Sequence, residues 1–134
     1  MLRLDEKKVS NMELIEHKHL IIRAEVLNPP KDEVWVQNWL TMLVDKIGMK
    51  IAKGPITAYV DVPGNEGITG LVAIETSHIA IHIWELLEPA LVQLDVYTCS
   101  SLDKDMIFAE LEQWNPTKVE WKYLDREFGL NEVE

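Results

Sequence analysis

Four short apolar segments follow one another in the middle of this chain, and only a few turn residues separate each from the next. The segments are 49–63, 68–75, 78–84 and 90–99. Parallel neighbours in a sheet need a crossover of about a dozen residues or more, whereas antiparallel neighbours can be joined by a tight turn. Connections such as GNEG (64–67) are too short for a crossover. The middle of the chain therefore predicts an antiparallel sheet.

Helical patterns flank this block of strands. Residues 34–48 repeat apolar side chains at helical spacing and follow a Pro-Pro-acid start signal. Residues 101–114 open with a Ser/Asp cap and predict a second helix. Strand-like segments at 19–27 and 115–124 complete the order β-α-β-β-β-β-α-β. This order predicts an α+β fold, a two-layer sandwich in which an antiparallel sheet carries two helices on one face.

The length of the chain suits one domain. With 134 residues it can bury about two thirds of the surface that the unfolded chain exposes, so it needs no metal or disulfide to fold. We expect an N-terminal extension over 1–16, a domain over 17–126 and a polar tail over 127–134.

The charge balance of the chain is acidic. Its 13 Lys and Arg face 23 Asp and Glu, a formal net charge of −10. Nucleic-acid binding depends on basic residues, so we expect no nucleic-acid partner. The acidity favours solubility, and the alternative is a site or partner that attracts a cation. No apolar run approaches membrane-spanning length, and Cys99, the one cysteine, excludes an intrachain disulfide. We expect no membrane partner and a cytoplasmic location.

The strand 78–84 carries unusual chemistry for a buried segment. In TSHIAIHIWE the side chains alternate between two faces. One face carries His78, Ala80, His82 and Trp84, and the other carries Ser77, Ile79, Ile81 and Ile83. The plain alternative is a half-buried strand with two hydrogen-bonded histidines. His78 and His82 lie roughly 13 Å apart along a strand, too far to share a metal, so no metal is expected. His17 and His19 precede a strand and are expected at the surface.

The segment TSHIAIHIWE, followed by LDVYTCS, resembles the small prokaryotic S-adenosylmethionine decarboxylases. The resemblance extends to HKHLIIRAEV and GITGLVAIE and covers about residues 17 to 125. It implies a fold of the same α+β type, a place in spermidine biosynthesis, S-adenosylmethionine as substrate, and a pyruvoyl cofactor that the chain makes from its own Ser77.

The resemblance also implies roles for individual residues. Ser77 would attack the carbonyl of Thr76 and cut the chain there. His82 would serve as the acid/base of this processing, helped by the hydroxyl of Thr69, and Cys99 would return a proton to the substrate carbon. The pyruvoyl ketone would form a Schiff base with the substrate amine and accept the electrons released with CO₂.

Three further residues are expected to bind the substrate. Trp84 can stack on the adenine or lie beside the sulfonium in a cation–π contact. A carboxylate can bind the ribose hydroxyls, and Glu85 and Glu88 are the nearest candidates.

The spacing of Ser77 and His82 predicts a shared site. Five residues of extended strand span about 16 Å, and the two side chains point to opposite faces, so they cannot meet within one strand. A two-fold homodimer would bring Ser77 and Cys99 of one chain to His82 and Thr69 of the other. The resemblance implies such shared sites as well.

The chain also departs from the family pattern. Thr76 stands before the serine where the family has Glu, Ile83 replaces a Thr, and Ser100 replaces the Gly after the cysteine. Two alternatives to a self-cleaving decarboxylase therefore stay open. One is an uncleaved, inactive family member that binds a ligand or regulates a partner, and the other is an interaction module with accidental resemblance.

Overall fold

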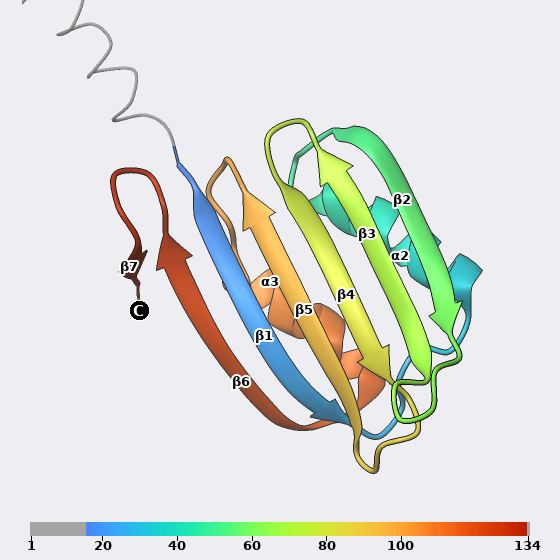
Figure 1. The fold of residues 1–134 in the computed structure, drawn as a ribbon. Coiled ribbons are helices and arrows are strands. Elements are labelled where there is room, and N and C mark those ends of the chain that lie inside the picture. Colours follow the sequence, from blue (N-terminus) through green and yellow to red (C-terminus); the bar gives the residue numbers. More distant parts are fainter. Residues whose placement is uncertain (1–15, 134) are drawn as a thin grey trace, which may run out of the picture.

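One antiparallel sheet runs through the whole structure, a computed structural model that describes residues 16–133. Its seven strands lie in the order β2-β3-β4-β5-β1-β6-β7 (Figure 1). The strands are β1 (Lys18–Val26), β2 (Ile51–Val60), β3 (Gly67–Ile74), β4 (His78–Trp84), β5 (Ala90–Thr98), β6 (Pro116–Asp125) and β7 (Asn131–Glu132). The helices are α2 (Glu33–Lys46), α3 (Lys104–Leu111) and the 3₁₀ turn η1 (Glu112–Trp114). The expected extension 1–16 lies, except for Glu16, outside the described residues.

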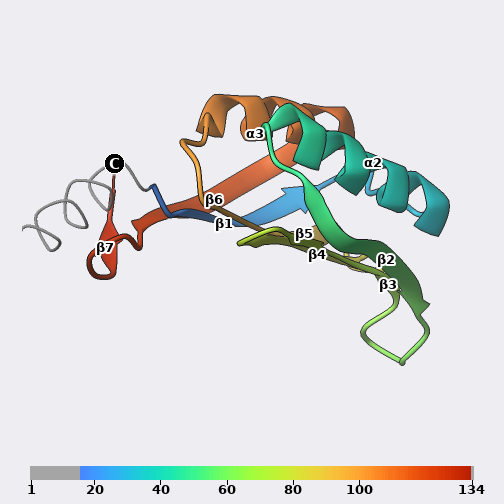
Figure 2. The same ribbon diagram turned by 90° about the horizontal axis from the view of Figure 1, so that it is seen from above.

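The two α-helices cover the same side of the sheet. Figure 2 shows α2 and α3 together above the strands, with the other side of the sheet left uncovered. We call this uncovered side the open face; its central residues are His19, Ile21, Leu71, His78, Ala80, His82, Asp95 and Tyr97. The predicted two-layer α+β sandwich, with two helices on one face of an antiparallel sheet, is confirmed.

Both helices begin where an aspartate caps them. Asp32 accepts a hydrogen bond from the Val34 N–H, and Asp103 accepts one from the Asp105 N–H. Such caps satisfy N–H groups that have no partner inside the helix. The second helix is shorter than the predicted 101–114, because the cap sits at Asp103 and the chain leaves the helix through η1 to Asn115, whose φ is 53°.

The core lies between the helices and the covered side of the sheet. In β4 the side chains of Ile79, Ile81 and Ile83 are buried, while those between them are not. Each such isoleucine contributes about 1.5–3 kcal/mol through burial. The period-2 alternation that the sequence predicts for 78–84 is thus the one that the structure shows.

The first strand lies inside the sheet. It pairs with β5 through Lys18–Thr98 to Val26–Ala90 and with β6 on its other side. The polar tail adds the short strand β7, which pairs with the end of β6. The N-terminal and C-terminal parts of the chain are therefore interleaved, and the residues at the start of β1 lie beside those at the ends of β5 and β6.

Candidate active site

The hairpin of β3 and β4 carries the residues that the sequence singled out. Ala73 pairs with His78 next to the turn, and Thr69 pairs with His82 four positions further along. Ser77 and Thr76 belong to the turn itself. The site residues therefore fall into two groups at opposite ends of β4, and about 16 Å of extended chain separates Ser77 from His82 within one chain.

The Ser77 end lies where β4 begins and β5 finishes. His78 pairs with Tyr97, so Ser77 and Cys99, each just past that pair, lie at the same end of neighbouring strands. The Ser77 N–H and carbonyl are engaged in the turn with Ile74, whereas its hydroxyl is buried and has no hydrogen-bond partner among the described residues. Cys99 is a half-buried free thiol. The hydroxyl is thus not committed to any structural bond.

Three rings lie together on the open face beside this end. The ring of Tyr97 is 5.5 Å from that of His78 and 5.6 Å from that of His19, and the two imidazoles are 6.0 Å apart. Arg126, at the end of β6, lies with its guanidinium 4.2 Å above the Tyr97 ring. Because β1 lies between β5 and β6 in the sheet, these residues from four separate segments of the chain come to one place.

The hydrogen bond between Arg126 and His19 fixes the state of this imidazole. Arg126 Nη1 lies 3.3 Å from His19 Nδ1, and because a guanidinium can only donate, Nδ1 must accept. Burial lowers the pKa of His19, and the charges of Arg126 and His78 lower it further against the opposing effect of Asp95. His19 is therefore neutral at pH 7 with its proton on Nε2. This Nε2 is buried and has no partner among the residues described.

The other end of β4 holds His82 and Thr69. The Thr69 hydroxyl lies 3.1 Å from His82 Nδ1, as expected for a hydroxyl that assists this histidine. His82 is exposed on the open face, and the ring of Trp84 lies 6.3 Å from its ring on the same side. The structure therefore brings together Thr69, His82 and Trp84, but it does not bring them to Ser77 of the same chain.

Trp84 and Glu85 are held by the β2–β3 turn. The indole N–H of Trp84 donates to Asn65 Oδ1 at 3.0 Å, and the Glu85 N–H donates to the Glu66 carbonyl at 3.0 Å. This close approach requires glycine at 67, because a Cβ there would lie 1.9 Å from the Ile83 carbonyl oxygen. The turn therefore positions the indole rather than leaving it mobile.

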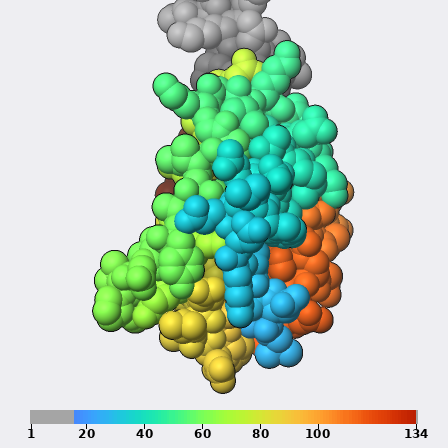
Figure 3. Space-filling view, turned by 90° about the vertical axis from the view of Figure 1, so that its right-hand side faces the viewer, coloured from blue at the N-terminus to red at the C-terminus, as the bar shows by residue number. Residues whose placement is uncertain are grey.

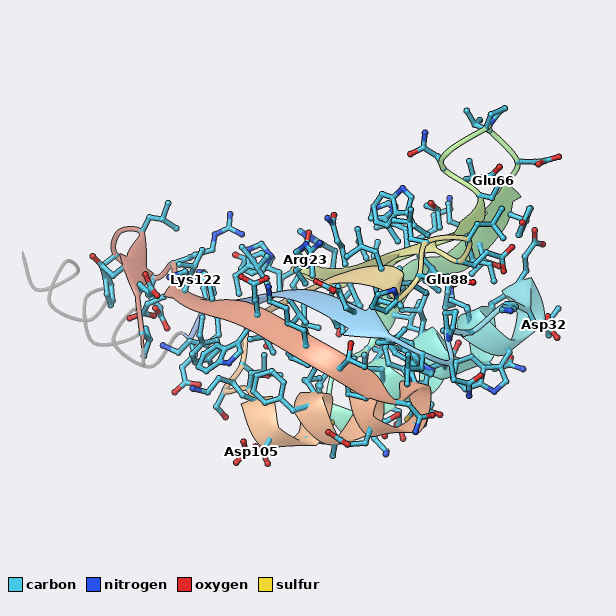
Figure 4. All side chains as sticks on the ribbon, turned by 90° about the horizontal axis from the view of Figure 1, so that it is seen from below. Arg23, Asp32, Glu66, Glu88, Asp105 and Lys122 are labelled. Atoms are coloured by element: carbon cyan, nitrogen blue, oxygen red, sulfur yellow. The ribbon has the colours of Figure 1, made fainter. Side chains whose placement is uncertain are left out.

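Carboxylates gather at the rim next to Trp84. The Tyr59 hydroxyl donates to Glu85, and this bond raises the pKa of Tyr59 to about 12. Glu85 and Glu88 line one groove of about 250 Å³. Figure 3 shows the β2–β3 turn (green) projecting beside the 85–89 connection (yellow), and Figure 4 labels Glu66 on the turn and Glu88 on the connection. The two glutamates expected to bind ribose are thus neighbours.

The residues at the Ser77 end fit a cofactor made from the chain itself. The buried hydroxyl of Ser77 has no competing hydrogen bond among the described residues, and Cys99 lies directly after the end of the adjacent strand β5. Within residues 16–133 no three His, Cys, Asp or Glu side chains are arranged to hold a metal ion. No described helix is long and apolar enough to cross a membrane.

Two residues of this site were not found from the sequence. The expectation that His19 lies at the surface is wrong for its Nε2, which is buried in the ring cluster. Arg126 lies at the border between the predicted domain and the tail and has no motif around it. Only the pairing of β1 with both β5 and β6 brings these two residues to Tyr97.

Comparison with known proteins identifies relatives of this chain. The family model described as S-adenosylmethionine decarboxylase matches residues 7–127. An S-adenosylmethionine decarboxylase proenzyme of Archaeoglobus fulgidus is 28% identical over 115 residues, which cover 84% of this chain and 99% of the relative. One of Persephonella marina is 36% identical over 62 residues, or 45% of each chain.

A solved structure has the same fold. The crystal structure of the adenosylmethionine decarboxylase from Aquifex aeolicus superposes with a TM-score of 0.63 at 24% sequence identity, covering 90% of this chain and 96% of the other. This likeness shows the fold. The family match extends over residues 7–127, most of the chain, and the chain therefore belongs to the S-adenosylmethionine decarboxylase family.

Proposed function

We propose that this protein is a proenzyme that cuts itself between Thr76 and Ser77 and then decarboxylates S-adenosylmethionine. The observation that carries the proposal is the Ser77 hydroxyl, which is buried at the head of β4 without a hydrogen-bond partner in the described part of the chain. A buried polar group without a partner costs about 1–3 kcal/mol, so its presence calls for a functional reason. Nucleophilic attack on the adjacent carbonyl supplies one.

The cleavage step is an acyl shift within the chain. The Ser77 oxygen attacks the Thr76 carbonyl carbon, the peptide C–N bond breaks, and an ester replaces the amide. Loss of the Ser77 α-proton then expels the Thr76 carboxylate and leaves a dehydroalanine. Water converts this group to a pyruvoyl group and releases ammonia, so the overall cleavage consumes one water and forms one ammonia. The proton transfers need an acid/base, which is the role proposed for His82 with Thr69 beside it at 3.1 Å.

The pyruvoyl group, once formed, supplies an electrophilic carbonyl that binds the substrate amine and withdraws electrons as CO₂ leaves. The side chains around it would bind the substrate and transfer the proton. The Cys99 thiol, at the end of the neighbouring strand, returns a proton to the substrate carbon. Trp84 offers an aromatic face for the adenosyl group, and Glu85 and Glu88 offer acceptors for the ribose hydroxyls.

The two ends of β4 are joined in this proposal by a second copy of the chain. Two open faces packed about a two-fold axis would place His82 and Thr69 of one protomer against Ser77 and Cys99 of its partner. The open face supports this arrangement because it carries exposed apolar side chains, Ile21 (37% exposed) and Leu71 (44%), between its polar ends. An isologous homodimer therefore has two equivalent shared sites.

Intact-mass spectrometry under denaturing conditions tests cleavage directly. We expect two fragments, residues 1–76 and 77–134, the second blocked by the pyruvoyl group. Ser77→Ala should remain one chain and release no CO₂ from carboxyl-labelled S-adenosylmethionine. A wild-type chain that stays intact after prolonged incubation would refute the proenzyme proposal and favour an uncleaved, ligand-binding family member, which Thr76 in place of the family's Glu would help to explain.

Mixing two inactive variants tests the shared site. Alone, Ser77→Ala should stay intact, and His82→Ala should be cleaved at least about 10²-fold more slowly than the wild type, so that neither shows cleavage within the assay. In a mixed dimer, the first variant supplies His82 to the Ser77 of the second, so the His82→Ala chain alone should be cleaved. Mass separates the two chains. Cleavage of neither chain in a sample that contains mixed dimers, as shown by native mass spectrometry, would exclude a site shared between protomers.

A further inference from the structure

An arginine that forms no ion pair with any described residue lies at the Ser77 end of the open face. Arg126 contacts the Tyr97 ring at 4.2 Å and His19 Nδ1 at 3.3 Å, and no carboxylate of the described residues forms an ion pair with it. The acids on both sides of it in sequence are engaged elsewhere: Asp125 and Glu127 bind Lys18 at 2.7 and 2.9 Å. In a chain with ten more acidic than basic residues, this guanidinium keeps free donors.

The residue that holds Arg126 also has an unused donor. His19 accepts from the guanidinium on Nδ1 and keeps its proton on Nε2, which is buried without a partner among residues 16–133. The guanidinium also lies over the face of the Tyr97 ring in a cation–π contact. Two donor groups, one on Arg126 and one on His19, thus lie at the same place and have no acceptor among residues 16–133.

We propose that Arg126, positioned by His19 and Tyr97, binds the α-carboxylate of an amino-acid ligand. The inference rests on the proposed function in one respect, the use of Ser77. The amine that reacts at position 77 and the α-carboxylate are attached to the same carbon atom, so the carboxylate must lie close to residue 77. His78, the residue after Ser77, pairs with Tyr97, and the guanidinium of Arg126 lies against the ring of Tyr97. Arg126 is therefore near residue 77.

A guanidinium suits this task because its parallel N–H groups match the two oxygens of a carboxylate. Asp95, on the same face of β5 as Tyr97, contributes a negative potential at His19 but makes no ion pair with Arg126 in the described structure. The carboxylate keeps much of its charge while the C–C bond breaks, so an arginine bound to it stabilises the substrate and the transition state about equally. Its removal should therefore raise KM and leave kcat nearly unchanged.

Calorimetry on the uncleavable Ser77→Ala chain tests the site without turnover. The probes are S-adenosylmethionine and the same compound without its carboxylate. We expect the first to bind about tenfold more tightly than the second. Adding Arg126→Gln should abolish this difference by weakening only the carboxylate-bearing ligand. Adding Lys118→Gln, which removes one positive charge from the far end of β6, should leave it unchanged.

Nitrogen-15 spectra of the imidazole rings test the positioning role of His19. In the Ser77→Ala chain His19 should show a protonated Nε2 and an unprotonated Nδ1, and Arg126→Gln should remove this fixed tautomer. His19→Leu should reduce the preference for the carboxylate as Arg126→Gln does, at an unchanged melting temperature of the variants' circular dichroism. Arg126→Lys should restore part of the preference, since it keeps the charge without the paired donors.

The outcomes separate this inference from the proposed function. Equal binding of both probes by the Ser77→Ala chain, no binding of either, or an unchanged preference in Arg126→Gln would overturn the carboxylate site. An intact wild-type chain in the mass spectrum overturns the proenzyme proposal alone, because the titrations do not require cleavage. If the wild type does cleave, Arg126→Gln should still cleave fully and show a KM about tenfold higher at similar kcat.

Discussion

The two sides of the sheet are made of the same strands but of different chemistry. On the covered side, β4 contributes Ile79, Ile81 and Ile83, all buried under the helices. On the open face the same strand contributes His78, Ala80, His82 and Trp84, which are exposed or half-buried. A single strand of seven residues therefore serves the core with one half of its side chains and the candidate active site with the other.

This difference separates stability from activity along one strand. The covered side consists of close-packed aliphatic groups, where any loss of volume is felt as loss of folding free energy. The open face holds titratable groups that contact one another at ring distances, through a few hydrogen bonds and through ion pairs such as that of Arg23 with Glu25. Substitutions one residue apart in sequence should consequently have effects of different kinds.

His82→Ala should have the largest effect, and it should be functional. Removal of a general acid/base lowers a rate by about 10²–10⁴-fold. We expect self-cleavage, followed by intact mass over time, to slow by at least the lower value. The free energy of unfolding, from urea titration of the Ser77→Ala background, should change by less than about 1 kcal/mol because the imidazole is exposed. A loss of several kcal/mol would show that the open face is structural.

Ile81→Ala, the neighbouring residue on the covered side, should show the reverse. Ile81 is fully buried, and truncation of such a side chain costs about 2–5 kcal/mol through lost burial and the cavity that remains. Urea titration should show this loss in the free energy of unfolding. At a temperature where the variant is folded, its cleavage rate should stay within a few-fold of the wild type. A milder Ile81→Val substitution provides the graded control.

Glu110→Gln should have the smallest effect, and only at neutral pH. Burial favours the neutral acid, but hydrogen bonds from Lys46 and Trp39 outweigh it and hold the pKa of Glu110 below its usual 4.5. A lowered folded-state pKa contributes stability above the unfolded-state value, and this contribution is lost as pH falls through the folded-state pKa. The substitution should therefore cost about 1 kcal/mol at pH 7 and nothing at pH 2.

The matched control for this prediction is Glu112→Gln, two residues further along, whose side chain makes no ion pair within the described residues. Its unfolding free energy should match the wild type at both pH values. Equal pH dependence in the Glu110→Gln variant and the wild type would contradict the assigned role of the Trp39–Glu110–Lys46 contact between the two helices.

Much of the fold follows from local signals in the sequence. The alternation of His and Ile in 78–84 and the acids near Asp32 and Asp103 act over a few residues, so the strand and the presence of both helices are predictable; the second helix begins three residues later than predicted. The end of the second helix is not predictable, because the chain leaves the helix through the 3₁₀ turn η1, which buries Trp114 in the core and ends at Asn115 in a left-handed conformation.

The candidate site likewise contains some residues that local sequence patterns predict and others that they do not. Ser77, His82, Thr69 and Cys99 are close to one another in sequence or lie on neighbouring strands of one hairpin series, and the Thr69 hydroxyl lies 3.1 Å from His82 Nδ1. Arg126 and His19 are 107 positions apart, and their contact depends on the insertion of β1 between β5 and β6. No local pattern encodes this insertion, since it follows from the pairing of the whole sheet.

The interleaved strand order would determine what happens to the two pieces after cleavage at Ser77. The first piece would contain β1, β2 and β3, and the second would contain β4 to β7. Across the sheet, β2-β3 would come from the first piece, β4-β5 from the second, β1 from the first and β6-β7 from the second. Separation would have to break three backbone ladders at once, those of β3 with β4, β5 with β1, and β1 with β6. The two fragments would therefore stay associated in one folded molecule after cleavage, and they would separate only when the sheet is unfolded by a denaturant.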